Sequence, residues 1–211
     1  MRSIICILTF LQLTCGPSLA KPAFGIKGGV NFAGATFDPE AISDIESRIC
    51  TLVGMAAETS LNSKNTILGR LEAMVVQKGW RMEYEALGYK NEASANIDEF
   101  VLAPSLVVRF PSEKLTPYIM GGMELGINLD AKYKTEFLGS TIEGGIDDWS
   151  KTNAGLNIGA GGAIPTGQGE IIVEIRYNLG LYNMITDGGE QSIKTNGTQV
   201  VFGYMFSVAT K

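Results

Sequence analysis

The chain has 211 residues, of which 45% are hydrophobic and 18% are charged, and its formal net charge is −5. This length and composition suit one sizeable folded domain and exclude a disordered or fibrous chain. The acidic balance argues against a nucleic-acid partner, and the lack of any His excludes a Ser–His triad, a His metal site and a His general base.

The first twenty residues have the pattern of a cleaved secretory signal peptide. Arg2 gives a positive start, residues 4–15 form a largely apolar stretch, and Ser18-Leu19-Ala20 offers the small residues of a cleavage site. The apolar stretch is shorter than the roughly 18–20 residues that a membrane-spanning helix needs. We therefore expect residues 1–20 to be removed and residues 21–211 to form the working domain.

Eight segments of the remaining chain show the two-residue alternation of β-strands, in which successive side chains point to opposite faces. The high Gly content also favours an all-β protein with many turns. The predicted strands cover residues 24–33, 48–59, 66–80, 97–110, 117–134, 153–163, 170–182 and 198–208.

The connections between these segments alternate strictly in length. Long polar gaps follow the first, third, fifth and seventh segments, at 34–47, 81–96, 135–152 and 183–197, and short turns separate the others. An up-and-down antiparallel barrel with an even number of strands places all its short turns at one rim and all its long loops at the other. The pattern predicts such a barrel, with the short rim and both termini facing the periplasm.

The segment 170–182 indicates which solvent the barrel faces. Ile171, Val173 and Ile175 lie on one face of the expected strand, whereas Glu174 lies on the other. Its thirteen residues exceed the usual strand length of about five or six, and a tilted strand that crosses a bilayer needs roughly 9–11. We therefore interpret the apolar face as a lipid-facing surface and predict an all-β, eight-stranded antiparallel up-and-down transmembrane β-barrel.

The polar faces of the same segments supply five basic and five acidic side chains that we expect to line the lumen. An eight-stranded barrel holds little more than side chains, and glycines on these faces would leave them room. The equal numbers allow pairing into a structural plug, since a buried carboxylate without a partner would cost several kcal/mol. The predicted cluster is Lys27, Arg70, Glu72, Glu99, Arg109, Glu124, Asp130, Lys132, Glu174 and Arg176. A narrow pore or a ligand site built from the same residues is the alternative.

Four stretches of sequence carry a family resemblance. They are GIKGGVNFAG at 25–34, RLEAMVVQKGW at 70–80, APSLVVRF followed by a short turn and PYIMGGMELGINLDAK, and EIRYNLGLYNM at 174–184. They resemble the porin-like outer-membrane β-barrel domain of the PorT-like group in Gram-negative bacteria. The resemblance implies an integral outer-membrane protein that is inserted by the barrel-assembly machinery and has no catalytic residues to carry over.

We therefore predict a structural, adhesion or surface-interaction barrel that contacts outer-membrane lipid and lipopolysaccharide and presents its long loops to a possible extracellular partner. We expect no enzymatic activity, no cofactor and no metal site. Three alternatives stay open: a small passive channel, a lipid-modifying enzyme that would need an unusual base because it has no His, and a soluble lipocalin-like binding barrel.

Overall fold

The computed structural model describes residues 22–38, 45–86, 89–137, 140–146, 149–185 and 192–207, so the predicted signal peptide lies outside the described residues. The described segments contain no helix long and apolar enough to cross a membrane. Their strands are β1 (Ala23–Asp38), β2 (Ile45–Ser60), β3 (Ile67–Ala86), β4 (Tyr89–Arg109), β5 (Thr116–Phe137), β6 (Ser140–Gly145), β7 (Thr152–Pro165), β8 (Gly169–Gly180) and β9 (Ser192–Ser207).

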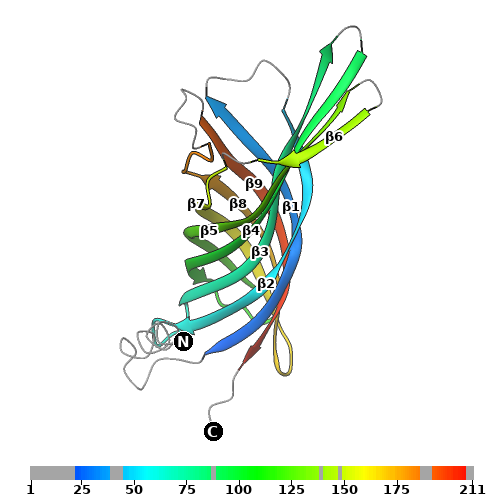
Figure 1. Cartoon of the computed structure of the whole chain (residues 1–211). Helices are drawn as coiled ribbons and strands as arrows, with labels where there is room; N and C mark the ends of the chain where they lie inside the picture. The colour runs from blue at the N-terminus through cyan, green and yellow to red at the C-terminus, as the bar shows by residue number, and fades with distance from the viewer. Residues whose placement is uncertain are drawn as a thin grey trace.

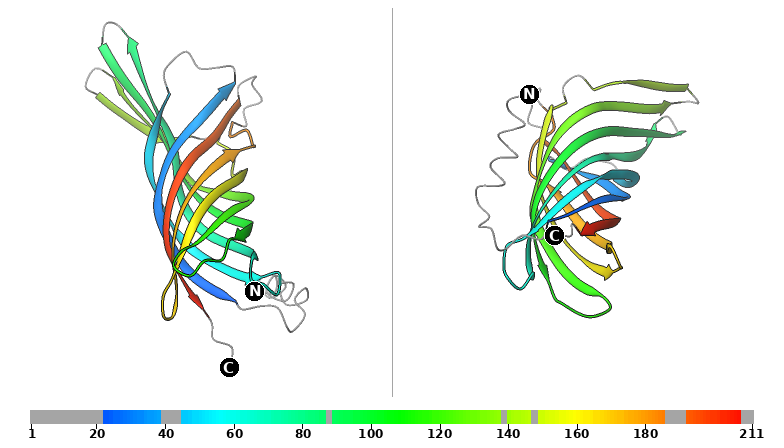
Figure 2. Two further views of the ribbon diagram at one scale, coloured as in Figure 1. Left: turned by 180° about the vertical axis from the view of Figure 1, so that it is seen from behind. Right: turned by 90° about the horizontal axis from the view of Figure 1, so that it is seen from below.

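Eight of these strands form a closed antiparallel barrel (Figures 1 and 2). Neighbours in the ring are neighbours along the chain, in the order β1, β2, β3, β4, β5, β7, β8 and β9, and the pairing of β1 with β9 closes it. The short strand β6 stands outside the ring and pairs with the distal part of β5, from Lys132↔Gly145 to Phe137↔Ser140. The predicted eight-stranded up-and-down barrel is confirmed.

The two rims of the barrel differ in their connections. Short turns join β2 to β3, β4 to β5 and β7 to β8 at one end, the short-turn rim, where β1 begins and β9 ends with the pair Ala23↔Ser207. At the opposite end, the hairpin rim, β3, β4, β5 and β6 continue together beyond the other strands (Figure 1). We call this continuation, built from residues 81–86, 89–96, 130–137 and 140–145, the projecting sheet.

The projecting sheet corrects the prediction of long loops at 81–96 and 135–152. Backbone pairing runs through both regions, for example between Glu83 and Glu92 and between Lys134 and Glu143. In β3 the alternation continues beyond the apolar belt, with Arg81, Glu83 and Glu85 on one face and Met82 and Tyr84 on the other, but neither face carries the large aliphatic residues that mark a lipid-facing strand. Periodicity therefore located the membrane-embedded part of each strand and not its end.

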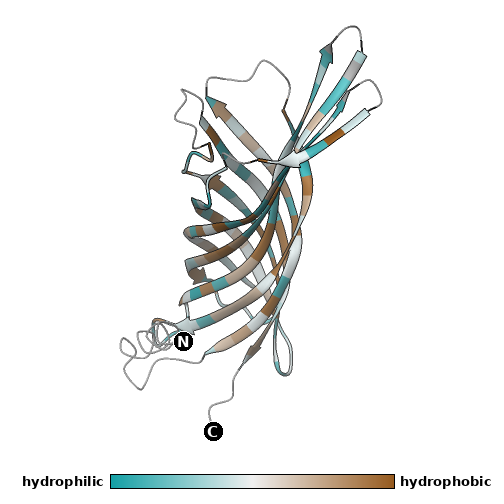
Figure 3. Cartoon of the chain, in the orientation of Figure 1, coloured by the Kyte–Doolittle hydropathy of each residue, from teal (hydrophilic) through white to brown (hydrophobic). Residues whose placement is uncertain are grey.

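The barrel wall is apolar outside and polar inside. In β8, Ile171, Val173 and Ile175 are 43%, 40% and 56% exposed, whereas Glu174 and Arg176 on the alternate face are each 1% exposed. Figure 3 shows the resulting alternation of hydrophobic and hydrophilic residues along the strands. A water-soluble barrel would bury the apolar face, so the structure contradicts the lipocalin-like alternative and supports the lipid-facing interpretation.

Candidate functional site: the ion-paired lumen

The larger cluster of buried charge lies in the half of the lumen nearer the short-turn rim, and we call it the lower network. Lys27 comes from β1, Arg70 and Glu72 from β3, and Glu174 and Arg176 from β8, and each residue is at most 3% exposed. These residues are far apart in the sequence. Their side chains meet in the lumen because each one occupies an inward-facing position of its strand.

Glu174 is the central acceptor of the lower network. Its carboxylate accepts hydrogen bonds from Lys27 Nζ at 3.1 and 3.2 Å, from Arg176 Nη2 at 2.8 Å and from the Tyr118 hydroxyl at 2.7 Å. Arg70 also donates to Glu174. The four donors leave this carboxylate fully compensated by charge and hydrogen bonds, which is what burial of a charged group requires.

Glu72 and Glu58 extend the lower network on either side. Glu72 pairs with Lys27 and accepts a hydrogen bond from Arg176 Nη1 at 2.6 Å. Towards the short-turn rim, Glu58 bridges Arg70 Nε at 2.5 Å and Arg109 Nη2 at 3.0 Å. Arg109, with 13% of its side chain exposed, also reaches Glu170 at 2.8 Å. Counted over the described residues, four cations face four carboxylates, so the lower network is electrically balanced.

A smaller cluster, the upper network, lies nearer the hairpin rim. Lys78 Nζ bridges Glu99 Oε2 at 3.1 Å and Glu124 Oε1 at 2.5 Å. Asn153 donates to Glu99 at 3.1 Å and Asn157 donates to Glu124 at 3.1 Å. Among the described residues, the upper network therefore holds one cation and two carboxylates, and one amide group donates to each carboxylate.

Glycines opposite the charged side chains make the room that the networks need. Gly159 is directly across the β7–β8 ladder from Arg176, and Gly161 is across the β5–β7 ladder from Tyr118. A Cβ atom added to Gly159 would lie 2.7 Å from Arg176 Cβ, and one added to Gly161 would lie 2.7 Å from the Tyr118 ring. A larger residue at either site would displace the network, because the interior of an eight-stranded barrel has space only for close-packed side chains.

Apolar clusters occupy both ends of the lumen. At the hairpin rim, Trp80 packs against Trp149 with ring centroids 5.6 Å apart and against Phe37 at 5.5 Å. Near the short-turn rim, Leu68, Met205 and six other buried residues form a second cluster around the lower network. Apart from Arg109 and Glu170 at the edge of the lumen, whose side chains are 13% and 25% exposed, the charged side chains therefore lie between apolar layers and are withdrawn from water.

The structure brings most of the predicted lumen residues together. Seven of them are buried in the two networks, namely Lys27, Arg70, Glu72, Glu99, Glu124, Glu174 and Arg176. Arg109 joins the lower network from the edge of the lumen.

Asp130 and Lys132 are corrections to the predicted cluster. They pair with each other at 2.5 Å on the outside of the barrel, with side chains 45% and 65% exposed. The cause is a register shift: Glu99 pairs with Asn128 but Asp98 pairs with Asp130, so β5 carries one extra residue there. A bulge of one residue exchanges the two faces of the strand beyond it.

Sequence reasoning missed several members of the networks. Lys78 has the same parity along β3 as Arg70 and Glu72, so strict alternation over the whole segment would have placed it in the lumen. Glu58 shares its face of β2 with the buried Ala56, but the hydrophobic pattern of that segment is too irregular to assign the face. For Tyr118, the only sequence signal of an inward-facing side chain is its even-numbered position in β5, which it shares with Glu124.

A closed barrel with an apolar exterior and a charged, desolvated interior defines an integral membrane β-barrel protein. Residues 20–186 match the family model "Outer membrane protein beta-barrel domain", and the chain belongs to this family. The protein is therefore located in the bacterial outer membrane, where its apolar exterior contacts membrane lipid. No match was found among curated proteins.

Solved structures of outer-membrane barrels are similar at low identity. Neisserial surface protein A (NspA) is 15% identical, covering 88% of this chain and 99% of that chain with a TM-score of 0.46. Ail of Yersinia pestis is 13% identical, covering 88% and 99% with a TM-score of 0.43. The outer membrane enzyme PagL is 14% identical, covering 83% and 97% with a TM-score of 0.41.

Proposed function

We propose that this protein is a closed, non-enzymatic barrel that anchors the projecting sheet at the cell surface for adhesion or another surface interaction. The observation that carries the proposal is the combination of a sealed lumen with a long, well-paired sheet outside the apolar belt. The barrel supplies the anchor, and the projecting sheet supplies the contact surface.

The burial of the lumen charges argues against a channel. Lys27, Glu72 and Arg176 are 3%, 0% and 1% exposed, so a water-sized sphere has almost no access to them. A conducting pore needs a continuous column of water along its polar lining. With the charges paired and apolar clusters at both ends, we expect no measurable conductance.

The same arrangement argues against catalysis in the lumen. Glu174 is occupied by four donors and Glu72 is paired with three cations, so neither has a vacant lone pair directed at a substrate. We therefore propose that the networks are a structural plug. Deletion of the gene should leave lipid A and phospholipid composition unchanged by mass spectrometry, and an altered lipid profile restored by complementation would contradict this part of the proposal.

The projecting sheet favours a surface role. Its ladder is continuous across β3, β4, β5 and β6, and pairs such as Arg81–Glu92 at 2.9 Å and Lys134–Glu136 at 2.7 Å cover it with charge of both signs. Within the described residues no strand pairs with the outer edge of β6. An exposed strand edge can accept a further strand from a partner, with exposed side chains giving specificity.

Orientation, assembly and processing complete the proposal. Outer-membrane barrels place short turns in the periplasm and long connections outside, so the projecting sheet would face the extracellular medium. We further propose cleavage after Ala20, insertion by the barrel-assembly machinery and membership of the PorT-like group, all of which rest on the sequence pattern.

The decisive experiment separates the anchor from the contact surface. Residues 83–92 are replaced by a two-residue Asn-Gly turn, which removes the tip of the β3–β4 hairpin and leaves the ring intact. We expect that cells carrying the shortened protein bind less well to host cells or to other bacteria. The folded barrel should still give its heat-modifiable band on a gel. Undiminished binding by the shortened protein, or single-channel currents from the intact protein in planar bilayers, would overturn the proposal.

A further inference from the structure

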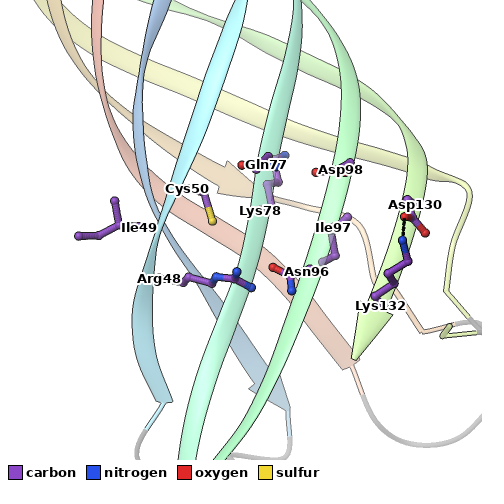
Figure 4. Close-up of a pocket in the computed structure, with 10 residues that line it drawn as sticks. All are labelled: Arg48, Ile49, Cys50, Gln77, Lys78, Asn96, Ile97, Asp98, Asp130 and Lys132. Atoms are coloured by element: carbon purple, nitrogen blue, oxygen red, sulfur yellow. Dashed lines mark ion pairs between the residues drawn. The ribbon is translucent and has the colours of Figure 1, made fainter. Parts of the chain in front are cut away.

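A hollow on the outside of the barrel lies at the base of the projecting sheet. It has a volume of about 170 Å³, spans β2 to β5, and its polar lining includes Arg48, Gln77, Asn96, Asp98, Asp130 and Lys132 (Figure 4). We call it the headgroup pocket.

Alternation places Gln77, Asn96 and Asp98 of the lining on the outer face. In β3, Val76 and Lys78 are 0% and 2% exposed, so Gln77 between them points outward. In β4, Ile97 at 1% points inward, which turns the neighbouring Asn96 and Asp98 outward. The headgroup pocket therefore opens on the outer face, and the buried residues Cys50, Lys78 and Ile97 complete its lining from the wall of the barrel.

Two irregularities create the hollow. The β2–β3 register shifts between Ser47 and Leu52, and the β4–β5 register shifts at Asp98–Glu99. Bulges bend strands and increase their twist, and the strands of the projecting sheet lean away from the rest of the barrel at the hairpin rim (Figure 1). Gly79 lies at the bottom of the hollow and has a φ of 149°. Because Gly79 has no side chain, Arg48 Nη1 can donate a hydrogen bond to the Ala95 carbonyl at 3.3 Å.

The headgroup pocket lies at the border of the apolar belt. Along β3 the outward residues change from Val75, which is 40% exposed, to Gln77, and along β5 they change from Ile127, which is 55% exposed, to Asp130. Such a change marks the depth at which acyl chains give way to lipid headgroups. With the proposed orientation, that depth belongs to the outer leaflet.

The lining suits a phosphate accompanied by a divalent cation. Arg48 offers a planar fork of donors that matches phosphate oxygens, and Lys132 adds a second positive charge. Asp98 and Asp130 are directly opposite each other across the β4–β5 ladder, where like charges destabilise the pair, and Lys132, which pairs with Asp130 at 2.5 Å, offsets only one of the two carboxylates. A cation between the two carboxylates would remove that repulsion.

We propose that the headgroup pocket binds the phosphorylated headgroup of lipopolysaccharide with its divalent counter-cation. Arg48 and Lys132 contact the phosphate, and Asp98 and Asp130 contact the cation. The inference rests on the outward-facing orientation proposed above. The proposal places a specific lipid contact on one side of the barrel, next to the projecting sheet. The bound lipid would stabilise that sheet.

The test measures binding of purified lipid A in magnesium to the detergent-solubilised barrel by native mass spectrometry. For Arg48→Gln and for Lys132→Gln we expect roughly a tenfold loss of lipid A affinity, as for loss of a charge-assisted hydrogen bond. Lys134→Gln is the matched control, because it removes the same charge from the projecting sheet outside the pocket, and it should retain wild-type affinity. Chelation of magnesium should weaken the wild type and leave Asp98→Asn less affected.

Two results would overturn the inference: equal lipid A affinity in wild type, Arg48→Gln and Lys132→Gln, or equal losses in these variants and in Lys134→Gln. Lys132 is 65% exposed on its side chain, so its variant keeps the test valid if Arg48→Gln fails to fold. Competition by millimolar inorganic phosphate alone would also count against a lipid site. The outcome is independent of the adhesion and conductance assays, so failure here is distinguishable from failure of the proposed function.

Discussion

Replacement of Lys78 by Met is the sharpest test of charge balance in the lumen. Its ammonium contacts Glu99 at 3.1 Å and Glu124 at 2.5 Å, and its side chain is 2% exposed. The variant leaves two buried carboxylates that face each other without a described cation. Removal of one partner from a buried ion pair costs about 3–5 kcal/mol, which lowers the folded-to-unfolded ratio roughly 100- to 4,000-fold.

Glu99→Gln is the matched control for this prediction. The upper network has one more carboxylate than it has cations, and this variant removes that extra negative charge. Lys78 then pairs with Glu124 alone, and the net charge of the upper network is zero. The amide keeps the shape of the side chain and its contact with Asn153, which donates to Glu99 at 3.1 Å. We therefore expect a cost below about 1 kcal/mol, the usual net contribution of one hydrogen bond.

Urea titration in lipid vesicles measures both variants. The two tryptophans, Trp80 and Trp149, are 7% and 9% exposed in the apolar cluster at the hairpin rim, so their fluorescence reports loss of the folded barrel. A triple variant with Lys78→Met, Glu99→Gln and Glu124→Gln should regain most of the stability that Lys78→Met loses. Equal destabilisation by Lys78→Met and Glu99→Gln would refute the charge-balance argument.

Three further changes test other parts of the structure. Gly159→Val should destabilise the barrel by about 1–3 kcal/mol through overpacking, because a Cβ there lies 2.7 Å from Arg176 Cβ. The control Gly121→Ala, on the outer face, should leave the urea midpoint unchanged in the same titration. Ile175→Arg should cost about 2–4 kcal/mol if that position lies near the bilayer midplane, and an unchanged midpoint in vesicles would show that its 56% exposed side chain does not face hydrocarbon. Asp130→Asn should leave the unfolding midpoint unchanged, since its pair with Lys132 is solvent-exposed, and a marked loss would contradict its placement outside the lumen.

Alternation predicted the faces of the strands wherever one face meets lipid. Ile171, Val173 and Ile175 were assigned outward and Glu174 inward from the sequence, and the structure places them so. The physical reason is that hydrocarbon rejects polar side chains at every outward position, which imposes a strict period of two. Outside the membrane no face needs large aliphatic residues, so the sequence predicts loops where the projecting sheet lies.

The candidate site was predictable only as far as the register was regular. A single extra residue near Leu129 reversed the faces of β5 and moved Asp130 and Lys132 from the predicted lumen to the exterior. Side-chain parity cannot detect such a bulge, because it depends on hydrogen bonding to β4. The partners within each network were also beyond the sequence, since Lys27 and Glu174 are 147 residues apart and meet only through closure of the ring.

This long-range contact bears on the order of assembly. Lys27 on β1 meets Glu174 on β8 after the first and last strands have zipped together, so an unclosed sheet holds charges whose partners have not arrived. Those charges must stay hydrated until the final seam forms, because stripping water from an uncompensated ion is prohibitively unfavourable. Pairing of β1 with β9 and loss of water from the lumen are consequently one concerted event. Half-inserted intermediates should therefore be short-lived.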